Sequence, residues 1–328
     1  MKPFHLSSLS AAGMMATLAV SFSGSATAQD WPRRPIKFVV PQSPGSTADI
    51  IARLLAQNLN GPLGQVPVVD NRAGAGGVLG ADIVAKAAPD GTTFLIANPS
   101  THGIASATYK KLPFDPIKDF APITRLADTE HVIVTGAEQP FKSLKEMIAG
   151  VKAAPDKFNY GTSGHGSSHH LSAALLVKEA GDLNMLHVPF KGTGPMLTAT
   201  LAGDVLWSLP AKPGALGQIR GGKLRALAAT GPKRAPELPD VPAVNEVVPG
   251  FQKVTWFGLA APAGTPPAII AQMNAGVVKA LDSVDARKSL EAAGLVLNLT
   301  TPETMAAHIA YEIDKWGKAA KAADFKPE

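Results

Sequence analysis

From residue 36 onward the chain alternates short β-rich runs with helical patterns, and this alternation limits the possible folds more than any other feature. Residues 36–40 favour a strand, and the turn-forming residues after them lead into a helical spacing of apolar side chains at 50–59. Further strands are expected at 66–69 and 93–97, with a helical segment between them. Strands separated by helices over so few residues predict βαβ units and a largely parallel sheet.

The middle of the chain repeats this alternation and predicts a second α/β lobe. Its expected strands and helices lie at residues 132–135, 143–154, 158–161, 167–180, 185–188, 195–202 and 224–229. The tail adds a strand at 254–260, helices at 266–281 and 286–293, and a last helix with Thr301 as its cap and Pro302 in its first turn. A chain of 328 residues commonly divides into about two domains, so we expect two lobes.

Two long segments are interpreted as crossovers between these lobes. Residues 116–125 and 236–255 mix Pro with polar residues and short extended pieces. The chain would leave the first lobe through one and return through the other. The predicted first domain is therefore discontinuous, with residues 29–124 plus 251–328, and the second domain is 125–250.

The N-terminus predicts export through a signal peptide at residues 1–28. Lys2 gives a positive start, residues 11–22 are largely apolar, and Ala26-Thr27-Ala28 matches a cleavage site. A membrane anchor needs about 20 apolar residues, which is longer than this stretch. We therefore expect a mature, soluble periplasmic protein that begins at Gln29.

Composition excludes several classes of function. The chain has no Cys, which excludes disulfides, iron–sulfur clusters, Cys-zinc sites, thiolate nucleophiles and a lipid anchor on Cys. Lys and Arg number 31 against 26 Asp and Glu, but they stand singly or in short pairs, so we expect no nucleic-acid partner. With 45% hydrophobic and 17% charged residues, the chain is expected to be globular rather than disordered.

A glycine-rich run at 74–80 is compatible with a dinucleotide-binding loop, because it follows a strand and opens a helix. Such a site needs an acidic residue at the end of the next strand, where this chain has Asn98. We interpret the run as a close-packed turn and expect no cofactor.

Three histidines raise the question of a metal site. His165 and His169 are four residues apart, as helical ligands can be, but Gly166 and Ser167 place the expected helix start between them. We expect no metal, and we assign His165 to the ligand cleft and His169 or His170 to packing.

A serine hydrolase is an alternative of a different class. Ser163 follows an expected strand and lies near histidines, but residues 161–165 lack the final Gly of the G-x-S-x-G nucleophile turn. No close pair of carboxylates at a strand end suggests glycosidase or aspartic chemistry.

Two loops give positive evidence for anion binding. Residues 41–49 and 161–168 carry Gly and Ser where a strand passes into a helix. At a helix N-terminus, free N–H groups donate hydrogen bonds to a carboxylate and the dipole attracts it, so that binding needs no Lys or Arg. Because each predicted lobe has one such junction, a small anion held between two lobes is the expected geometry.

At these loops the chain resembles the Bug family, the periplasmic substrate-binding proteins of tripartite tricarboxylate transporters. The resemblance covers essentially the whole mature chain. Its matching segments are residues 36–41, 44–45, 49–53, 71–80, 89–91, 118–122, 160–168, 187–192, 222–228 and 256–266. Each motif is modest alone, and their order along the chain makes the resemblance specific.

The resemblance implies an α/β fold of the type II periplasmic binding class, with two Rossmann-like lobes and a ligand cleft between them. It also implies a bound organic carboxylate and delivery to a large and a small membrane subunit, without catalysis or a cofactor. We expect a monomer. The alternative is a soluble sensor subunit that presents a carboxylate to a signalling receptor.

Carried over position by position, the resemblance implies a set of ligand-binding residues. Gln42 to Thr47 would form the first carboxylate loop, which Asp49 ties, and Asn98 to Thr101 would form the cleft wall. The expected ligand-binding residues are Gln42, Ser43, Gly45, Ser46, Thr47, Asp49, Asn98, Ser100, Thr101, Ser163, Gly164, His165, Gly166, Ser167, Ser168, Leu209 and Pro210.

Two departures from the family pattern bear on the ligand. Ser46 stands where the family usually has a second Gly, and Leu206 and Pro210 stand where it has acids. Without an acid there, an ammonium group would stay unpaired in a desolvated cleft. We therefore expect a carboxylate without an amine, and an apolar or aromatic body is an open option.

Overall fold

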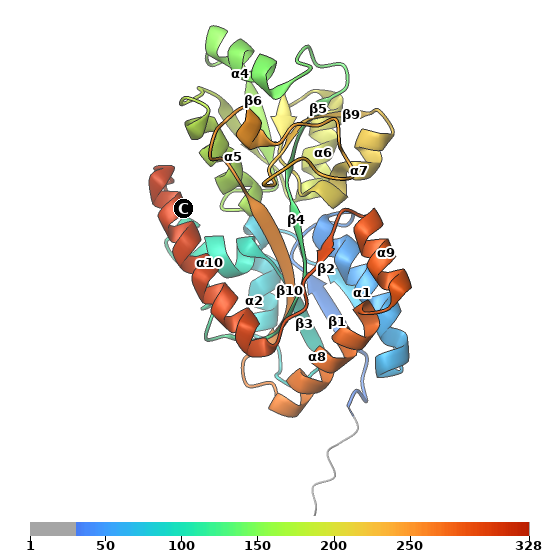
Figure 1. Cartoon of the computed structure of the whole chain (residues 1–328). Helices are drawn as coiled ribbons and strands as arrows, with labels where there is room; N and C mark the ends of the chain where they lie inside the picture. Colours follow the sequence, from blue (N-terminus) through green and yellow to red (C-terminus); the bar gives the residue numbers. More distant parts are fainter. Residues whose placement is uncertain (1–30, 328) are drawn as a thin grey trace, which may run out of the picture. The chain divides into compact units, whose positions relative to one another are not determined.

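The computed structural model describes residues 31–327, and within it the chain from Pro32 onward forms one compact unit built on two β-sheets (Figure 1). Given in their order across the sheet, the six strands of the first are β11 (Val296–Leu297), β4 (Phe120–Glu130), β10 (Val254–Pro262), β3 (Thr93–Ala97), β1 (Lys37–Val40) and β2 (Val68–Asn71). The five of the second are β7 (Leu186–Pro189), β6 (Asn159–Thr162), β8 (Trp207–Ser208), β5 (Val132–Gly136) and β9 (Leu224–Ala229).

Both sheets are mixed, so the expected parallel pairing is confirmed for β1, β2 and β3, the strands on which it was based, and is wrong for the sheet as a whole. β1 pairs in parallel with β2 and β3, but β10 runs antiparallel to both β3 and β4. The second sheet likewise joins parallel β6 pairings to antiparallel β5 pairings. The cause in the first sheet is the return of the chain, because β4 carries it towards the second sheet and β10 brings it back alongside (Figure 1).

The crossover expected at 116–125 overlaps the start of β4 at Phe120, and β4 is the strand that carries the chain towards the second sheet. Residues 236–253 contain one short 3₁₀ turn, η3 (Val244–Glu246), before β10 begins. The predicted boundaries at 124/125 and 250/251 stay a prediction, and the predicted signal peptide lies outside the described residues.

Helices cover the sheets largely where the sequence predicts them. The helical segments are α1 (Thr47–Leu63), η1 (Ala75–Gly77), α2 (Val78–Ala85), η2 (Ser100–Ile104), α3 (Ala105–Thr108), α4 (Leu144–Ala153), α5 (Ser168–Glu179), α6 (Thr193–Ala202), α7 (Lys212–Arg220), α8 (Pro267–Leu281), α9 (Val284–Ala292) and α10 (Pro302–Ala322). The sequence did not predict α7, because Pro213, Gly214 and Gly217 weaken its helical signal. Of the described helices, none combines the length and apolar character that crossing a membrane requires.

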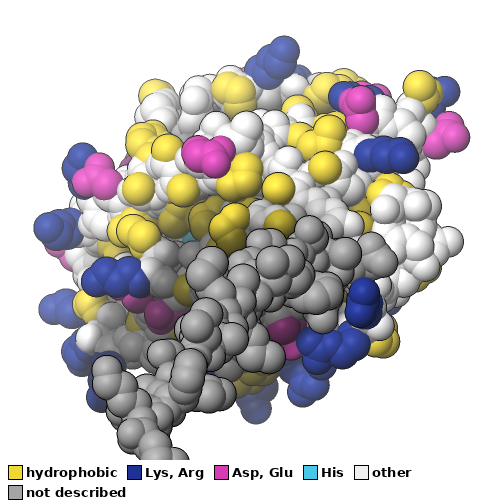
Figure 2. Space-filling view, turned by 90° about the horizontal axis from the view of Figure 1, so that it is seen from below, with side chains coloured by type: hydrophobic (Ala, Val, Ile, Leu, Met, Phe, Trp, Pro, Cys, Tyr) yellow, Lys and Arg dark blue, Asp and Glu magenta, His cyan; other side chains and the backbone are white. Residues whose placement is uncertain are grey.

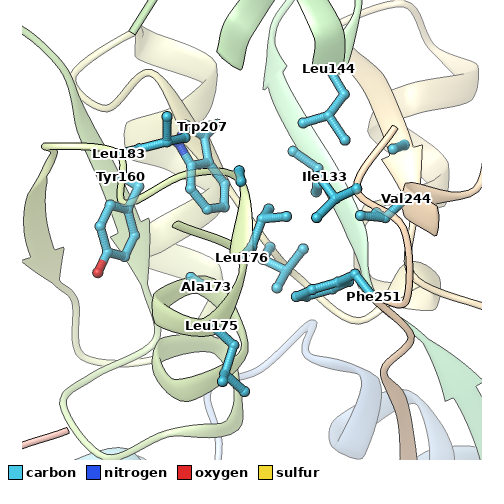
Figure 3. Close-up of a cluster of buried hydrophobic side chains, with 14 of the residues drawn as sticks. Ile133, Leu144, Tyr160, Ala173, Leu175, Leu176, Leu183, Trp207, Val244 and Phe251 are labelled. Carbon is cyan, nitrogen blue, oxygen red and sulfur yellow. The ribbon is translucent and has the colours of Figure 1, made fainter. Parts of the chain in front are cut away.

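An apolar core lies against the second sheet and contains side chains from distant parts of the chain (Figure 3). Ile133 of β5, Leu176 of α5 and Phe251, which precedes β10, are fully buried together. The indole ring of Trp207 stacks on the ring of Tyr160 at 5.2 Å between centroids. Burial of such side chains contributes about 1.5–3 kcal/mol each and fixes the strand ends that carry the site.

The C-terminal helix α10 packs on the cores of both sheets. Its first turns carry Met305 and Ile309 into the core that contains β1, β3 and β10, whereas Trp316 joins the core of the second sheet. Between them, the buried carboxylate of Glu312 accepts hydrogen bonds from the indole N–H of Trp256 at 3.0 Å and of Trp316 at 2.8 Å. One acid on α10 therefore holds a tryptophan from β10 and one from its own helix.

On the face in Figure 2, Lys and Arg side chains stand near the edge with Asp and Glu side chains among them. In the part of that face that the grey residues leave visible, they do not gather into one continuous patch. The spacing of the basic residues along the sequence is consistent with this mixture.

Glu312→Leu should lower the free energy of unfolding by about 3 kcal/mol, because two buried indole N–H groups lose their acceptor. Glu312→Gln keeps an acceptor oxygen and should cost about half as much. Urea denaturation of both variants measures the difference. Equal losses in the two variants would show that the negative charge of Glu312, which also pairs with Lys315 Nζ at 2.7 Å, matters more than an acceptor for the indole N–H groups.

Candidate functional site

A small cavity lies at the N-terminal ends of helices that follow strands of both sheets. Its volume is about 10 Å³, and it is lined by Gln42, Thr47, Asn98, His131, Ser168, His169, Thr193, Ala211, Thr255 and Phe257. None of these ten described residues carries a full charge as Lys, Arg, Asp or Glu. The cavity is therefore polar without a formal charge of its own, apart from any that the histidines acquire.

Four helices present their N-terminal ends to this cavity. Thr47, Ser168 and Thr193 are the first residues of α1, α5 and α6, and Ala211 caps the N-terminus of α7. N–H groups in the first turn of a helix lack partners within the helix, and the dipole places partial positive charge there. A neutral cavity among four such ends favours a bound anion.

The loop before α1 is held by its own side chains. Ser46 caps the helix by accepting a hydrogen bond from Asp49 N at 3.3 Å, and Asp49 Oδ2 accepts one from Gly45 N at 3.0 Å. Burial works against ionisation of Asp49, but hydrogen bonds from Arg53 and Gly45 outweigh it and lower the pKa of the carboxyl. Asp49 thus ties the loop and does not line the cavity.

The corresponding loop of the second sheet, residues 161–168, is also held by the residue that caps the helix after it, Ser167. Ser167 Oγ accepts from His170 N at 3.2 Å and donates to the carbonyl oxygen of Gly164 at 2.7 Å. Ser168 N donates to Ser100 Oγ at 2.9 Å. Ser100 lies in η2 at the end of β3, so this bond joins the loop of one sheet to that of the other.

Glycines outside the two loops mark places where other segments approach them closely. A Cβ on Gly76 would lie 2.6 Å from the carbonyl oxygen of His165, and one on Gly192 would lie 2.8 Å from Ser43 Oγ. Gly80 packs equally tightly against Pro41. The glycine-rich run at 74–80 therefore serves close packing in this structure.

The structure brings only part of the predicted set to the cavity wall. Gln42, Thr47, Asn98 and Ser168 line the cavity. The remaining members of the loops lie beside it or support it: Ser43, Gly45, Ser46, Asp49, Ser100, Thr101, Ser163, Gly164, Gly166 and Ser167.

Three predicted residues lie elsewhere in the structure. The ring of His165 packs against His170 and Phe325, at 4.8 and 5.2 Å between centroids. Leu209 belongs to the apolar core of the second sheet, and the carbonyl oxygen of Pro210 accepts a hydrogen bond from Val132 N at 2.9 Å. Their direct part in binding stays a prediction that the cavity lining does not support.

Six lining residues were not among the predicted ones: His131, His169, Thr193, Ala211, Thr255 and Phe257. Thr193 and Ala211 stand at helix starts, so the rule that found the first two loops also applies to them. His131 has no such signal, because it lies between two strands in the sequence.

Five of the described histidines gather in two groups, and His102 and His308 belong to neither. His165, His170 and His187 pack together outside the cavity, where burial lowers the pKa of His170 to about 2 and that of His187 to about 4. His131 and His169 face the cavity with their rings edge to face at 5.4 Å. Within the described residues, no group of three or more His, Asp or Glu could hold a metal ion.

Two α/β lobes with a neutral, anion-favouring cavity at their helix N-termini define a periplasmic-binding-protein fold. The chain belongs to the tripartite tricarboxylate transporter family receptors, whose sequence pattern matches residues 51–325. The fold also matches solved relatives. The periplasmic binding protein BugD is 31% identical, with a TM-score of 0.87 over 91% of this chain and 100% of that one.

Two further solved structures contain ligands. The Rpa4515 protein of R. palustris with adipate is 34% identical, with a TM-score of 0.88 over 91% of this chain and 100% of that one. MatC from Rhodopseudomonas palustris with bound malate is 36% identical, with a TM-score of 0.83 over 88% of this chain and 99% of that one. Both ligands are small organic carboxylates.

Asp49→Asn should weaken the folded state by about 1 kcal/mol at neutral pH, because the ionised carboxylate accepts two stronger hydrogen bonds than an amide oxygen can. The folded-state pKa of Asp49 is lowered, so this advantage is present above its ordinary value of 3.8 and is lost as pH falls through the folded pKa. Urea denaturation of both proteins across this pH range measures the difference. If the difference in unfolding free energy persisted at the lowest pH, the ionised carboxylate of Asp49 would not be its cause.

Proposed function

We propose that this chain is a periplasmic solute-binding protein that captures a small organic carboxylate between its lobes. It would deliver the ligand to the large and small membrane subunits of a tripartite transporter. The observation that carries the proposal is the neutral cavity at which four helix N-termini meet. Each such terminus stabilises an anion by about 0.3–1 kcal/mol, and more where water is excluded.

Binding requires the cavity to open. A volume of about 10 Å³ has room for about one water molecule, which is too small for a dicarboxylate. The hydrogen bonds from Ser168 N to Ser100 Oγ and from Gly194 N to Ser43 Oγ join the two lobes at its rim. We infer that these contacts break when ligand enters and form again around it, as in hinge closure.

The neutral lining also bears on the ligand class. Four positive helix ends repel an ammonium group, and no acidic residue lines the described cavity to pair with one. Leu206 and Pro210, which replace the family's acids, lie outside the lining. We infer an amine-free carboxylate. The apolar body suggested by residues 206–210 finds less support, because Leu206 and Leu209 are part of the apolar core.

The serine hydrolase alternative has one observation in its favour. Ser163 Oγ lies 2.5 Å from His169 Nδ1, as a nucleophile and its base would. Burial lowers the pKa of His169 to about 4, which makes it a weak base at neutral pH. No described carboxylate is hydrogen-bonded to the His169 ring to orient it. We infer that Ser163 supports the loop and that the ligand leaves chemically unchanged.

The sensor alternative shares the site and differs in the partner. Co-purification from the periplasm and membrane of the source cells, with the two membrane subunits of a transporter or with a receptor kinase, separates the two.

Thr47→Pro tests the helix-terminus account directly. Proline is tolerated in the first position of a helix, and Ser46 already has the extended conformation that must precede it, so the change removes the backbone N–H and the hydroxyl group of Thr47 and leaves the helix in place. We expect about tenfold weaker binding in calorimetry with the best acid from a thermal-shift screen of mono-, di- and tricarboxylates. The matched control, Thr47→Val, removes the hydroxyl group and keeps the N–H.

Similar affinities for the Pro and wild-type proteins would refute the backbone role of α1 in binding. Chromatography of the acid recovered after release should show it unchanged, and any turnover would favour the hydrolase.

Amine-free acids should bind more than about 100-fold more tightly than aspartate or glutamate, since an unpaired buried ammonium costs several kcal/mol. Calorimetry of succinate against aspartate, and of glutarate against glutamate, gives the ratio. Tighter binding of either amino acid would overturn the inferred ligand class.

A further inference from the structure

The cavity contains buried polar atoms that no other described group satisfies. Asn98 Nδ2, Thr193 Oγ1 and both ring nitrogens of His131 lack hydrogen-bond partners. All three side chains line the same cavity. Because leaving a buried polar group unpaired costs about 1–3 kcal/mol, a cluster of them in one cavity points to a ligand that pairs with them.

His131 is the most constrained of the three. Its side chain is 1% exposed, and it lies between the end of β4 and the start of β5. Its backbone N–H donates to Thr230 Oγ1 at 3.0 Å, and its carbonyl oxygen accepts from Thr230 N at 2.9 Å. A bridge to Ala211 holds the other side. The backbone is thus fixed at the point where both lobes meet the cavity.

The ring of His131 is neutral at physiological pH. Burial, together with the neighbouring His169, lowers its pKa well below the usual 6.5. The nearest acid in sequence, Glu130, is paired with Lys212 Nζ at 3.0 Å. A neutral imidazole offers one N–H donor and one nitrogen lone pair that accepts.

One of these two ring nitrogens, the one that carries the lone pair, differs from the donors around it in what it requires. Helix N-termini and Asn98 Nδ2 donate hydrogen bonds and so match carboxylate oxygens, which only accept. The lone pair of His131 needs a donor, which an ionised carboxylate lacks. An alcohol O–H both donates and accepts, and it carries no charge that the positive helix ends would repel.

We propose that His131 recognises a hydroxyl group on the ligand, so that this protein selects hydroxycarboxylates over acids of the same chain length without the hydroxyl. The inference rests on the proposed function and names the ligand class within it. The carboxylate would lie at the helix N-termini and the hydroxyl at His131.

Calorimetry with two matched pairs of acids tests this proposal. Malate differs from succinate, and 2-hydroxyadipate from adipate, by one hydroxyl group. We expect the hydroxy acid of at least one pair to bind about tenfold more tightly to the wild-type protein. His131→Phe should reduce this ratio to about one, and His131→Asn, which keeps a donor and an acceptor, should retain part of it.

A control variant separates this role from general damage. His308→Phe replaces a half-buried histidine on α10 that does not line the cavity, so its ratio should equal that of the wild type. Should His131→Phe fail to fold, nitrogen NMR of the wild-type imidazoles gives an independent measurement. The His131 signals should move more with malate than with succinate.

Four outcomes overturn the inference. These are equal affinity for both members of each pair, a preference that persists in His131→Phe, binding of none of the four acids, and uptake of a proton by His131 when succinate binds. The last outcome, detected by calorimetry in buffers of different ionisation enthalpy, would mean that a charged imidazolium pairs with a second carboxylate. The wider thermal-shift screen decides separately whether the protein binds a carboxylate at all.

Discussion

The antiparallel pairing of β4 and β10 is the constraint on which the rest of the structure depends. Residues from Val254 to Pro262 pair with residues from Glu130 back to Phe120, so the outgoing and returning strands lie side by side. His131 follows β4 directly, and Thr255 and Phe257 lie on β10. The pairing that connects the lobes therefore also supplies part of the cavity wall, and a movement of one lobe against the other acts on the ligand site.

The sequence predicts most of the fold because its signals are local. Strands 93–97 and 224–229 are confirmed with the predicted bounds, and the last helix begins at Pro302 with Thr301 as its cap. Local signals do not reveal strand direction where it depends on distant pairing, so the parallel pairing of β1, β2 and β3 was predicted and the antiparallel pairing of β10 with β3 and β4 was not. They also missed β8 and β11, because a strand of two residues carries almost no periodic pattern.

The site was predictable to the extent that it consists of helix starts. Gln42, Thr47 and Ser168 belong to the two predicted helix-start loops, Asn98 was implied by the family resemblance, and all four line the cavity. His131 belongs to no motif, and only the tertiary fold shows that its ring is buried without a partner. The resemblance implied that residues 206 and 210 determine specificity, whereas in the structure the residue of this segment that lines the cavity is Ala211.

A cavity lined by neutral groups has consequences for how tightly it can hold a charge. Arg or Lys would bind a carboxylate through a full point charge, and the site would then stay occupied even at low ligand concentrations. Helix termini share the charge over many N–H groups, and each terminus contributes about 0.3–1 kcal/mol, so no single terminus holds the ligand alone. Release then needs only a modest opening, because each contact is weak and water replaces it. This arrangement suits a protein that must both capture its ligand and give it up.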